Sequence, residues 1–192
     1  MKNRLINYFQ KITNLNSSDC KVLSESMTNV SYKKGSYLIK EGEYENDSFF
    51  VMEGLVRQYK IVDGEEITTN FFTEEQWIIN FESIEGKSIS KYNLICEEDT
   101  TVVVGDEEKA QKLFKQIPKF ERVSRQIMET VFKEQQEQMV SYLTDKPEKR
   151  YLNLLKSRPD IFQRVAQYHI ASYIGVKPES LSRIRKKLNQ KN

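Results

Sequence analysis

The chain has 192 residues, of which 38% are hydrophobic and 30% are charged, and its formal net charge is +2. This composition is typical of a folded globular protein with one large domain or two small ones. A single histidine and two cysteines are too few for a closed zinc site or a cysteine-ligated iron–sulfur cluster. Two cysteines so far apart in sequence, Cys20 and Cys96, form no disulfide framework. There is no apolar run of about 18 residues and no signal-peptide core, so we expect a reduced, cytoplasmic protein without metal or membrane partner.

Charge is distributed unevenly along the chain. Residues 145–192 contain 12 Lys and Arg against 4 Asp and Glu, a net charge of +8, whereas residues 1–144 carry a net charge of −6. An acidic body followed by a basic C-terminal quarter suggests a tail domain that faces nucleic acid. A solvated helical surface is the other interpretation, and charge alone does not separate the two.

The first two-thirds of the chain predict a helical start followed by a β-rich region. Residues 2–28 have apolar residues at helical spacing, and Ser17-Ser18-Asp19 is typical of the cap of a second short helix. From about Val30 to Val104 the apolar pattern alternates with period two, and glycine turns divide it into seven or eight short strands. Asp63-Gly64 between two of these runs predicts a hairpin, because both turn positions need a positive φ. So many short strands favour a sandwich or a barrel-like roll.

After a short helix that ends before Pro118, a long helix is expected from Lys119 to about Leu143, a stretch without Gly or Pro. Its apolar residues form one narrow stripe, which could be a spine within the chain or a coiled-coil seam between two chains. We predict a dimer seam, made by Phe120, Val123, Ile127, Val131 and Gln138. The expected divisions are therefore 1–118 for a sensor domain, 119–144 for a dimerisation and linker helix, and 145–192 for a DNA-binding domain.

The strongest local signal is QYHIASYIGVKPESLSRIRKK, residues 167–187. A helix-turn-helix needs a small residue where its two helices cross, and Ala171 supplies it. Four residues later, Gly175 provides the positive φ of a tight turn. Pro178 can begin the second helix without losing a hydrogen bond. Further apolar residues fall where they would hold the two helices together: Ile170, Ile174, Val176, Leu181 and Ile184.

Candidate DNA contacts lie at and beyond the start of this second helix. Arginine can pair with guanine and glutamate can accept from cytosine, while the other basic residues suit phosphates. The predicted DNA-binding residues are Lys177, Glu179, Ser180, Ser182, Arg183, Arg185, Lys186 and Lys187. The single histidine, His169, fits a structural or phosphate-near role better than a catalytic one.

In the order of its parts the chain resembles the Crp/Fnr family of bacterial transcription regulators. The most specific stretches are KRYLNLL (149–155) and IASYIGVKPESLSRIRKKL (170–188), and weaker marks are Lys34-Gly35, KEGE (40–43), FFVMEG (49–54) and EDT (98–100). The resemblance implies an α+β fold with an N-terminal double-stranded β-roll like that of cyclic-nucleotide-binding proteins, a long dimerisation helix and a C-terminal winged helix-turn-helix.

The resemblance also implies partners: a homodimer, a roughly palindromic operator in double-stranded DNA with half-sites about 34–36 Å apart, and RNA polymerase. Glu179, Ser180 and Arg183 match the base-contacting positions of the family. Pro178 stands where an arginine is common, so a different operator is expected.

The cyclic-nucleotide signature of the family is not matched. Cyclic-AMP-binding members hold the phosphate with an arginine next to Ser or Thr, and the ribose with a glutamate after a glycine. Here Ser90 stands in place of the arginine, Asn80 in place of the glutamate and Ile79 in place of the glycine, and Lys91 offers no guanidinium fork. We therefore expect no physiological binding of cyclic AMP. No cofactor is assigned, and an unidentified small molecule is the candidate effector. The candidate ligand pocket comprises Asn80, Phe81, Ser90, Lys91 and Tyr92.

The sequence thus predicts a sequence-specific DNA-binding transcription regulator. The alternative is a small-ligand-binding or protein-interaction module whose helix-turn-helix does not read DNA. An enzyme is not predicted, since no nucleophile–base pair or phosphate-cradling loop is present and the run Glu97-Glu98-Asp99 is expected to be solvated.

Overall fold

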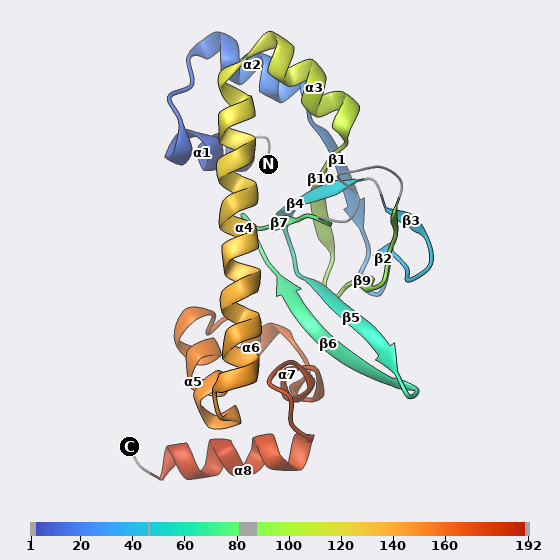
Figure 1. Ribbon diagram of the computed structural model, residues 1–192, viewed down its shortest axis with the longest axis vertical. Coiled ribbons are helices and arrows are strands. Elements are labelled where there is room, and N and C mark those ends of the chain that lie inside the picture. The colour runs from blue at the N-terminus through green and yellow to red at the C-terminus, as the bar shows by residue number, and fades with distance from the viewer. Residues whose placement is uncertain (1–2, 46, 81–87, 191–192) are drawn as a thin grey trace.

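The computed structural model describes residues 3–45, 47–80 and 88–190. The long helix α4 (Lys119–Thr144) runs along the molecule, with the β-strands on one side of it (Figure 1). Helices α1 (Asn3–Ile12), α2 (Ser17–Ser26) and α3 (Glu107–Gln116) gather at one end of α4, and the last four helices surround its other end. None of the helices in these ranges combines the length and apolar character needed to span a bilayer.

The cap of α2 lies one residue earlier than predicted. Asn16 is the N-cap, and its side chain accepts a hydrogen bond from the Asp19 amide at 2.8 Å. The Asp19 carboxylate accepts in return from the Asn16 amide at 2.9 Å. This reciprocal capping box satisfies two of the amide donors that a helix start leaves without intrahelical partners.

The predicted β-roll is confirmed as two four-stranded antiparallel sheets and a small two-stranded one. The first sheet has the order β1-β10-β4-β7, the second β2-β9-β5-β6, and β3 pairs with β8. Asp63 and Gly64 have φ of 52° and 83°, as the predicted β5–β6 hairpin turn requires. The strand bounds are β1 Thr28–Tyr32, β2 Tyr37–Ile39, β3 Tyr44–Glu45, β4 Ser48–Glu53, β5 Val56–Val62, β6 Glu65–Phe72, β7 Trp77–Ile78, β8 Ser88–Ile89, β9 Asn93–Cys96 and β10 Thr100–Gly105.

The stripe of α4 predicted as a dimer seam faces its own protomer, so that prediction is wrong. Phe120, Val123 and Ile127 are buried in a cluster with residues of α1, α2, β4 and β10, and the Phe120 ring meets the Phe9 ring edge-on with 5.0 Å between centroids. The other two predicted seam residues face the same way: Val131 packs at the border of this cluster and Gln138 donates to the Thr69 carbonyl. The apolar stripe is the intramolecular spine, because α1 and the roll need an apolar surface to close their core.

A second apolar face of α4 is exposed instead. Phe132, Met139 and Leu143 are 51%, 60% and 74% exposed, and their spacing of seven and four residues places them on one side of a helix. This side lies about 120° around the helix axis from the buried stripe, since each residue turns a helix by about 100°.

The C-terminal helices are α5 (Pro147–Ser157), α6 (Ile161–Arg164), α7 (Gln167–Tyr173) and α8 (Pro178–Asn189). As predicted, Pro147 and Pro178 each begin a helix. The predicted wing is not observed, because residues 145–190 contain no β-strand. The β5–β6 hairpin of the roll lies against α7 instead (Figure 1).

Candidate functional site

The turn between α7 and α8 has the local geometry that the sequence predicted. Ala171 is fully buried where the two helices cross. Gly175 has φ of +73°, and a Cβ built there would lie 2.9 Å from the hydroxyl of Tyr142 and 3.2 Å from the Arg150 guanidinium. The positive φ is what favours glycine at this position, since the groups near it are the ends of side chains from α4 and α5.

The side chain of Arg150, on α5, holds the same turn through hydrogen bonds. Its Nε and one terminal nitrogen donate to the Ile174 carbonyl at 2.9 and 2.7 Å, and its other terminal nitrogen donates to the carbonyls of Tyr142 and Asp145. These bonds join the end of α7 to the α4–α5 junction, so the position of α8 is defined relative to the long helix.

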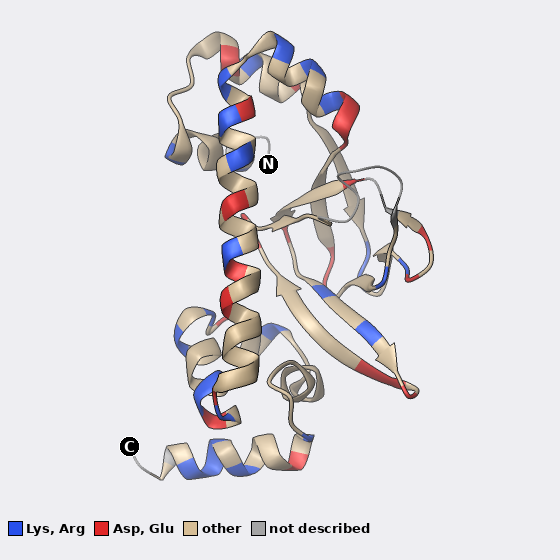
Figure 2. Cartoon of the chain, viewed as in Figure 1, with Lys and Arg blue, Asp and Glu red and all other residues tan. Residues whose placement is uncertain are grey.

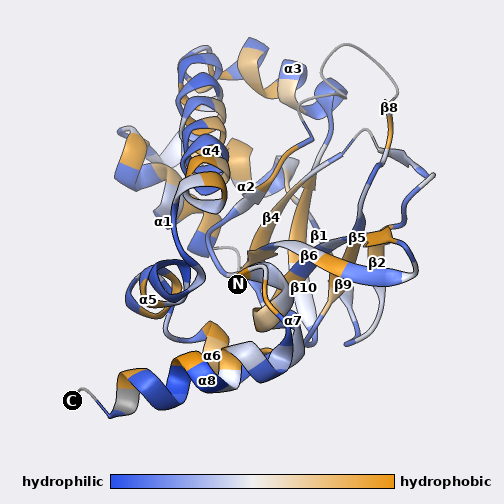
Figure 3. Ribbon diagram, turned by 60° about the horizontal axis from the view of Figure 1, so that its bottom comes forward, coloured by the Kyte–Doolittle hydropathy of each residue, from blue (hydrophilic) through white to orange (hydrophobic). Residues whose placement is uncertain are grey.

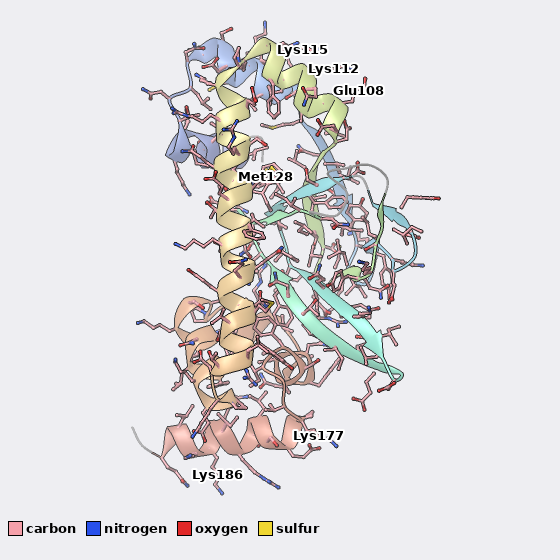
Figure 4. The ribbon with its side chains drawn as sticks, in the orientation of Figure 1. Glu108, Lys112, Lys115, Met128, Lys177 and Lys186 are labelled. Carbon is pink, nitrogen blue, oxygen red and sulfur yellow. The ribbon has the colours of Figure 1, made fainter. Side chains whose placement is uncertain are left out.

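Helix α8 has one apolar face and one exposed face. Leu181 and Ile184 are buried against α5–α7, and α8 alternates along its length between hydrophilic and hydrophobic residues (Figure 3). Turning about 100° per residue places four predicted DNA contacts on the outward face, and all four are exposed: Glu179, Ser182, Arg183 and Lys186. Lys186 points away from the rest of the molecule (Figure 4).

The other predicted contacts lie on the flanks of α8 or at its start. Lys177, the residue before the helix, is exposed, and Ser180 is half-buried. Arg185 donates to the Gln167 side chain at 2.6 Å, and Lys187 pairs with Glu148 at 2.7 Å. The outward face and its flanks together give this end of the molecule a concentration of basic residues (Figure 2).

In the candidate ligand pocket, the side chain and the backbone of Ser90 make hydrogen bonds within the protein itself. The Ser90 side chain is buried and donates to the Tyr92 carbonyl at 2.9 Å, while the Ser90 backbone bonds to Gly42 and Glu43. Lys91 and Tyr92 are exposed and Asn80 is half-buried, while Phe81 lies outside the described residues. Ser90 is thus committed to its own turn, which leaves it little capacity to bind a phosphate.

A separate groove of about 700 Å³ lies where the roll, α4, α5 and α7 meet. Its lining includes Tyr8, Trp77, Tyr173 and Arg158, and the predicted pocket residues that the structure describes are not among those that line it. Arg158 donates to the Phe71 carbonyl and the Thr73 hydroxyl. Burial lowers the pKa of the Arg158 guanidinium.

Sequence reasoning missed a cluster of charged residues between the roll and the C-terminal helices. Glu97, predicted to be solvated, has a side chain that is only 16% exposed and pairs with the buried Arg57 at 2.5 Å. Glu98 pairs with Arg164 at 2.6 Å. Only Asp99, which pairs with Lys33 in an exposed position, behaves as predicted. The partners are 40 and 66 positions apart, and no local pattern links residues at such distances.

His169 lies inside this cluster. Its side chain is buried, with Nε2 3.6 Å from a carboxylate oxygen of Glu97. Burial, with the nearby positive charge of Arg57, lowers the pKa of His169 below its usual 6.5, although Glu97 and Glu66 act in the opposite direction. The position is a packed interior one, which fits the structural role predicted from sequence.

The lowered pKa of His169 predicts a pH-dependent stability. The unfolded chain takes up a proton at His169 at a higher pH than the folded chain does, so this histidine stabilises the fold above about pH 6.5, and the contribution is lost as pH falls through the folded pKa. We expect the free energy of unfolding to fall between about pH 7 and about pH 5.5 in the parent, and to fall less in His169→Gln. Urea unfolding at the two pH values measures this, and an equal fall in both proteins would contradict it.

The sequence of residues 29–117 matches the family of cyclic nucleotide-binding domains. No curated protein matches the chain closely enough to count as a relative. Among solved structures, FixK2 from Bradyrhizobium japonicum is similar with a TM-score of 0.69 at 19% identity, over 86% of this chain and 85% of that one.

Two further structures are similar over most of both chains. The c-di-GMP-responsive global regulator CLP of Xanthomonas campestris has a TM-score of 0.69 at 17% identity, over 92% of this chain and 93% of that one. A protein of Eubacterium rectale assigned to the Crp/Fnr family of transcriptional regulators has a TM-score of 0.64 at 19% identity, over 96% and 88%. At these identities the likeness establishes the fold. Residues 29–117 are therefore similar in sequence to cyclic nucleotide-binding domains, and the chain shares its overall fold with these solved structures.

Proposed function

We propose that the protein is a sequence-specific DNA-binding transcription regulator, in which α7 and α8 form a helix-turn-helix and α8 enters the major groove. The observation that carries this proposal is the outward face of α8. Glu179, Arg183 and Lys186 are exposed there, on a helix that Arg150 and Gly175 fix at the outer end of a C-terminal region with a net charge of +8.

The residue types on this face suit direct reading of bases. Arg183 can donate two hydrogen bonds to guanine O6 and N7, and Glu179 can accept from cytosine N4. Arg185, Lys186 and Lys187 are placed for phosphates, which fix position without reading sequence. The Gln167 and Glu148 partners of Arg185 and Lys187 would be exchanged for phosphate on binding.

We propose further that the protein acts as a homodimer, joined through the exposed apolar face of α4 rather than the buried stripe. Two copies would present two α8 helices to successive major grooves of a roughly palindromic site, with half-sites about 34–36 Å apart.

Removing the Arg183 guanidinium should weaken specific binding. Arg183→Ala is expected to cost about 1–3 kcal/mol of operator affinity and to relax base preference at one position of each half-site. Fluorescence anisotropy with operator and single-substitution duplexes measures both effects. Lys115→Ala, which removes an exposed positive charge from α3 at the far end of the molecule, should leave affinity and preference unchanged. Unchanged base preference in Arg183→Ala would remove Arg183 from the reading face.

We propose that the sensor domain responds to a small molecule other than cyclic AMP. Ser90 uses its hydroxyl within its own turn, and an ammonium such as that of Lys91 cannot supply the bidentate fork a buried phosphate needs. A calorimetric titration with cyclic AMP is expected to give no binding heat. Micromolar affinity would contradict this part of the proposal.

The alternative is a ligand-binding or protein-interaction module whose helix-turn-helix does not read DNA. Salt dependence separates the two. A DNA reader loses affinity steeply as salt rises, because each neutralised phosphate releases a counterion, and this dependence should decrease when Arg183 and Arg185 are replaced. A protein-interaction module would bind duplex DNA weakly or not at all under the same conditions.

A further inference from the structure

The first helix of the helix-turn-helix covers a free edge of the sensor sheet. Strand β6 is the outermost strand of its sheet, so one side of its backbone has no strand partner. The Ser172 hydroxyl of α7 accepts a hydrogen bond from the Thr68 amide at 2.9 Å and donates to the Glu66 carbonyl at 3.1 Å. One side chain thus satisfies a donor and an acceptor of the edge, in the manner of a neighbouring strand.

Helix α6 holds the roll at a second point. The Arg164 guanidinium forms a two-sided fork: it donates to both carboxylate oxygens of Glu98 at 2.6 and 3.1 Å, and to both of Glu74 at 3.0 Å. Glu74 follows β6 and Glu98 lies between β9 and β10, so the fork spans two loops of the roll. These hydrogen bonds raise the pKa of Arg164, and although burial alone would raise the pKa of Glu74, its bonds from Arg164 and Gly54 hold it below the ordinary value.

Between these two points lies a continuous apolar core. Leu55 and Phe71 of the roll are fully buried in the same cluster as residues of α5, α6, α7 and α8. The C-terminal helices therefore share a hydrophobic core with the sensor domain. The β5–β6 hairpin packs against α7, and the described C-terminal helices have no strand of their own.

We propose that Ser172 and Arg164 are positioning residues for DNA binding, which together clamp α6 and α7 to the roll and so hold α8 in one orientation. This inference rests on the proposed function. The clamp covers the inner side of α7 and leaves the outward face of α8 exposed, so the clamped form has its reading face free. When only a fraction of the molecules hold α8 in the orientation that binds DNA, the measured affinity is reduced in proportion to that fraction. The clamp raises this fraction.

Breaking the clamp should weaken operator binding without touching a DNA-contacting residue. We expect Arg164→Gln and Ser172→Ala each to raise the dissociation constant for operator on the order of tenfold. Arg164→Lys, which keeps the charge but loses the fork, should have a dissociation constant between those of the parent and of Arg164→Gln. Glu98→Gln with Glu74→Gln, which leaves Arg164 in place but removes the charges of both partners, should weaken binding similarly, a result that lost packing of Arg164 alone would not give. Unchanged or tighter binding by Arg164→Gln and Ser172→Ala would overturn the proposal.

A second measurement tests the clamp when no DNA is present. A dye on Lys186→Cys, in a Cys20→Ser background, reports the motion of α8 through time-resolved fluorescence anisotropy. Arg164→Gln should add a component of independent motion, and Ser172→Ala should accelerate hydrogen exchange of the Thr68 amide. The parent protein could bind no duplex while the variants still show the changes in anisotropy and hydrogen exchange. That result would refute the proposed function and leave the clamp as a structural connection. Identical anisotropy decays in parent and Arg164→Gln would refute the clamp itself.

Discussion

Replacing Phe132 and Met139 of α4 by aspartate is expected to convert a dimer into monomers. Both side chains are more than half exposed in the single chain and fall on one face at coiled-coil spacing, so they would become buried against a second copy. Fully burying an exposed apolar side chain contributes about 1.5–3 kcal/mol, and a dimer would bury the exposed part of four such side chains. A carboxylate in their place loses this contribution and must also be desolvated. Sedimentation equilibrium on the double variant should show a single species near the mass of one chain.

The control uses the opposite side of the same helix. Thr130 is exposed and lies away from the Phe132 face, so Thr130→Asp adds a similar charge without entering the interface and should remain dimeric. The monomeric variant should also lose most of its operator affinity, because one α8 helix then reads one half-site alone. Persistence of dimers in the double variant would place the interface elsewhere on the molecule.

Replacing Phe71 by alanine is expected to destabilise the roll and the C-terminal helices together. The Phe71 side chain is fully buried, its ring lies 5.2 Å from that of Tyr173, and it belongs to the cluster that joins β6 to α5–α8. A large-to-small change at such a site costs about 3–5 kcal/mol, because the cavity collapses only in part. Urea unfolding followed by the fluorescence of Trp77, the only tryptophan, and by circular dichroism should shift as one transition.

Tyr44→Ala serves as the comparison, because Tyr44 lies on the roll and is 69% exposed. The Tyr44→Ala substitution should change the free energy of unfolding by no more than about 0.5 kcal/mol, as most surface substitutions do. A loss of less than about 1 kcal/mol in Phe71→Ala, or separate transitions for the roll and the helices, would show that the two parts do not share a core.

The features that the sequence predicted well are those set by neighbouring residues. The Asp63-Gly64 hairpin, the positive φ of Gly175 and the helix starts at Pro147 and Pro178 follow from backbone restrictions of the residues themselves. Their physical causes act over two to four positions, so a single sequence contains them.

The mispredicted features depend on which element, or which second chain, packs against the residues concerned. The stripe through Phe120 and Ile127 was recognised as apolar, but periodicity does not tell whether α1 and β4 or a second chain covers it. The second apolar face at Phe132 and Met139 is broken by polar residues, so the sequence shows no periodic stripe there. The contacts of Arg164 and Ser172 with the roll join residues 66 to 106 positions apart, and no local pattern encodes them.

Selection from a pool of random duplexes tests most directly whether α8 reads DNA. The purified protein should enrich a roughly palindromic sequence with half-sites one helical turn apart, and its affinity for that sequence should fall steeply with rising salt. A protein that enriches no sequence, and whose weak binding barely changes with salt, would contradict the account.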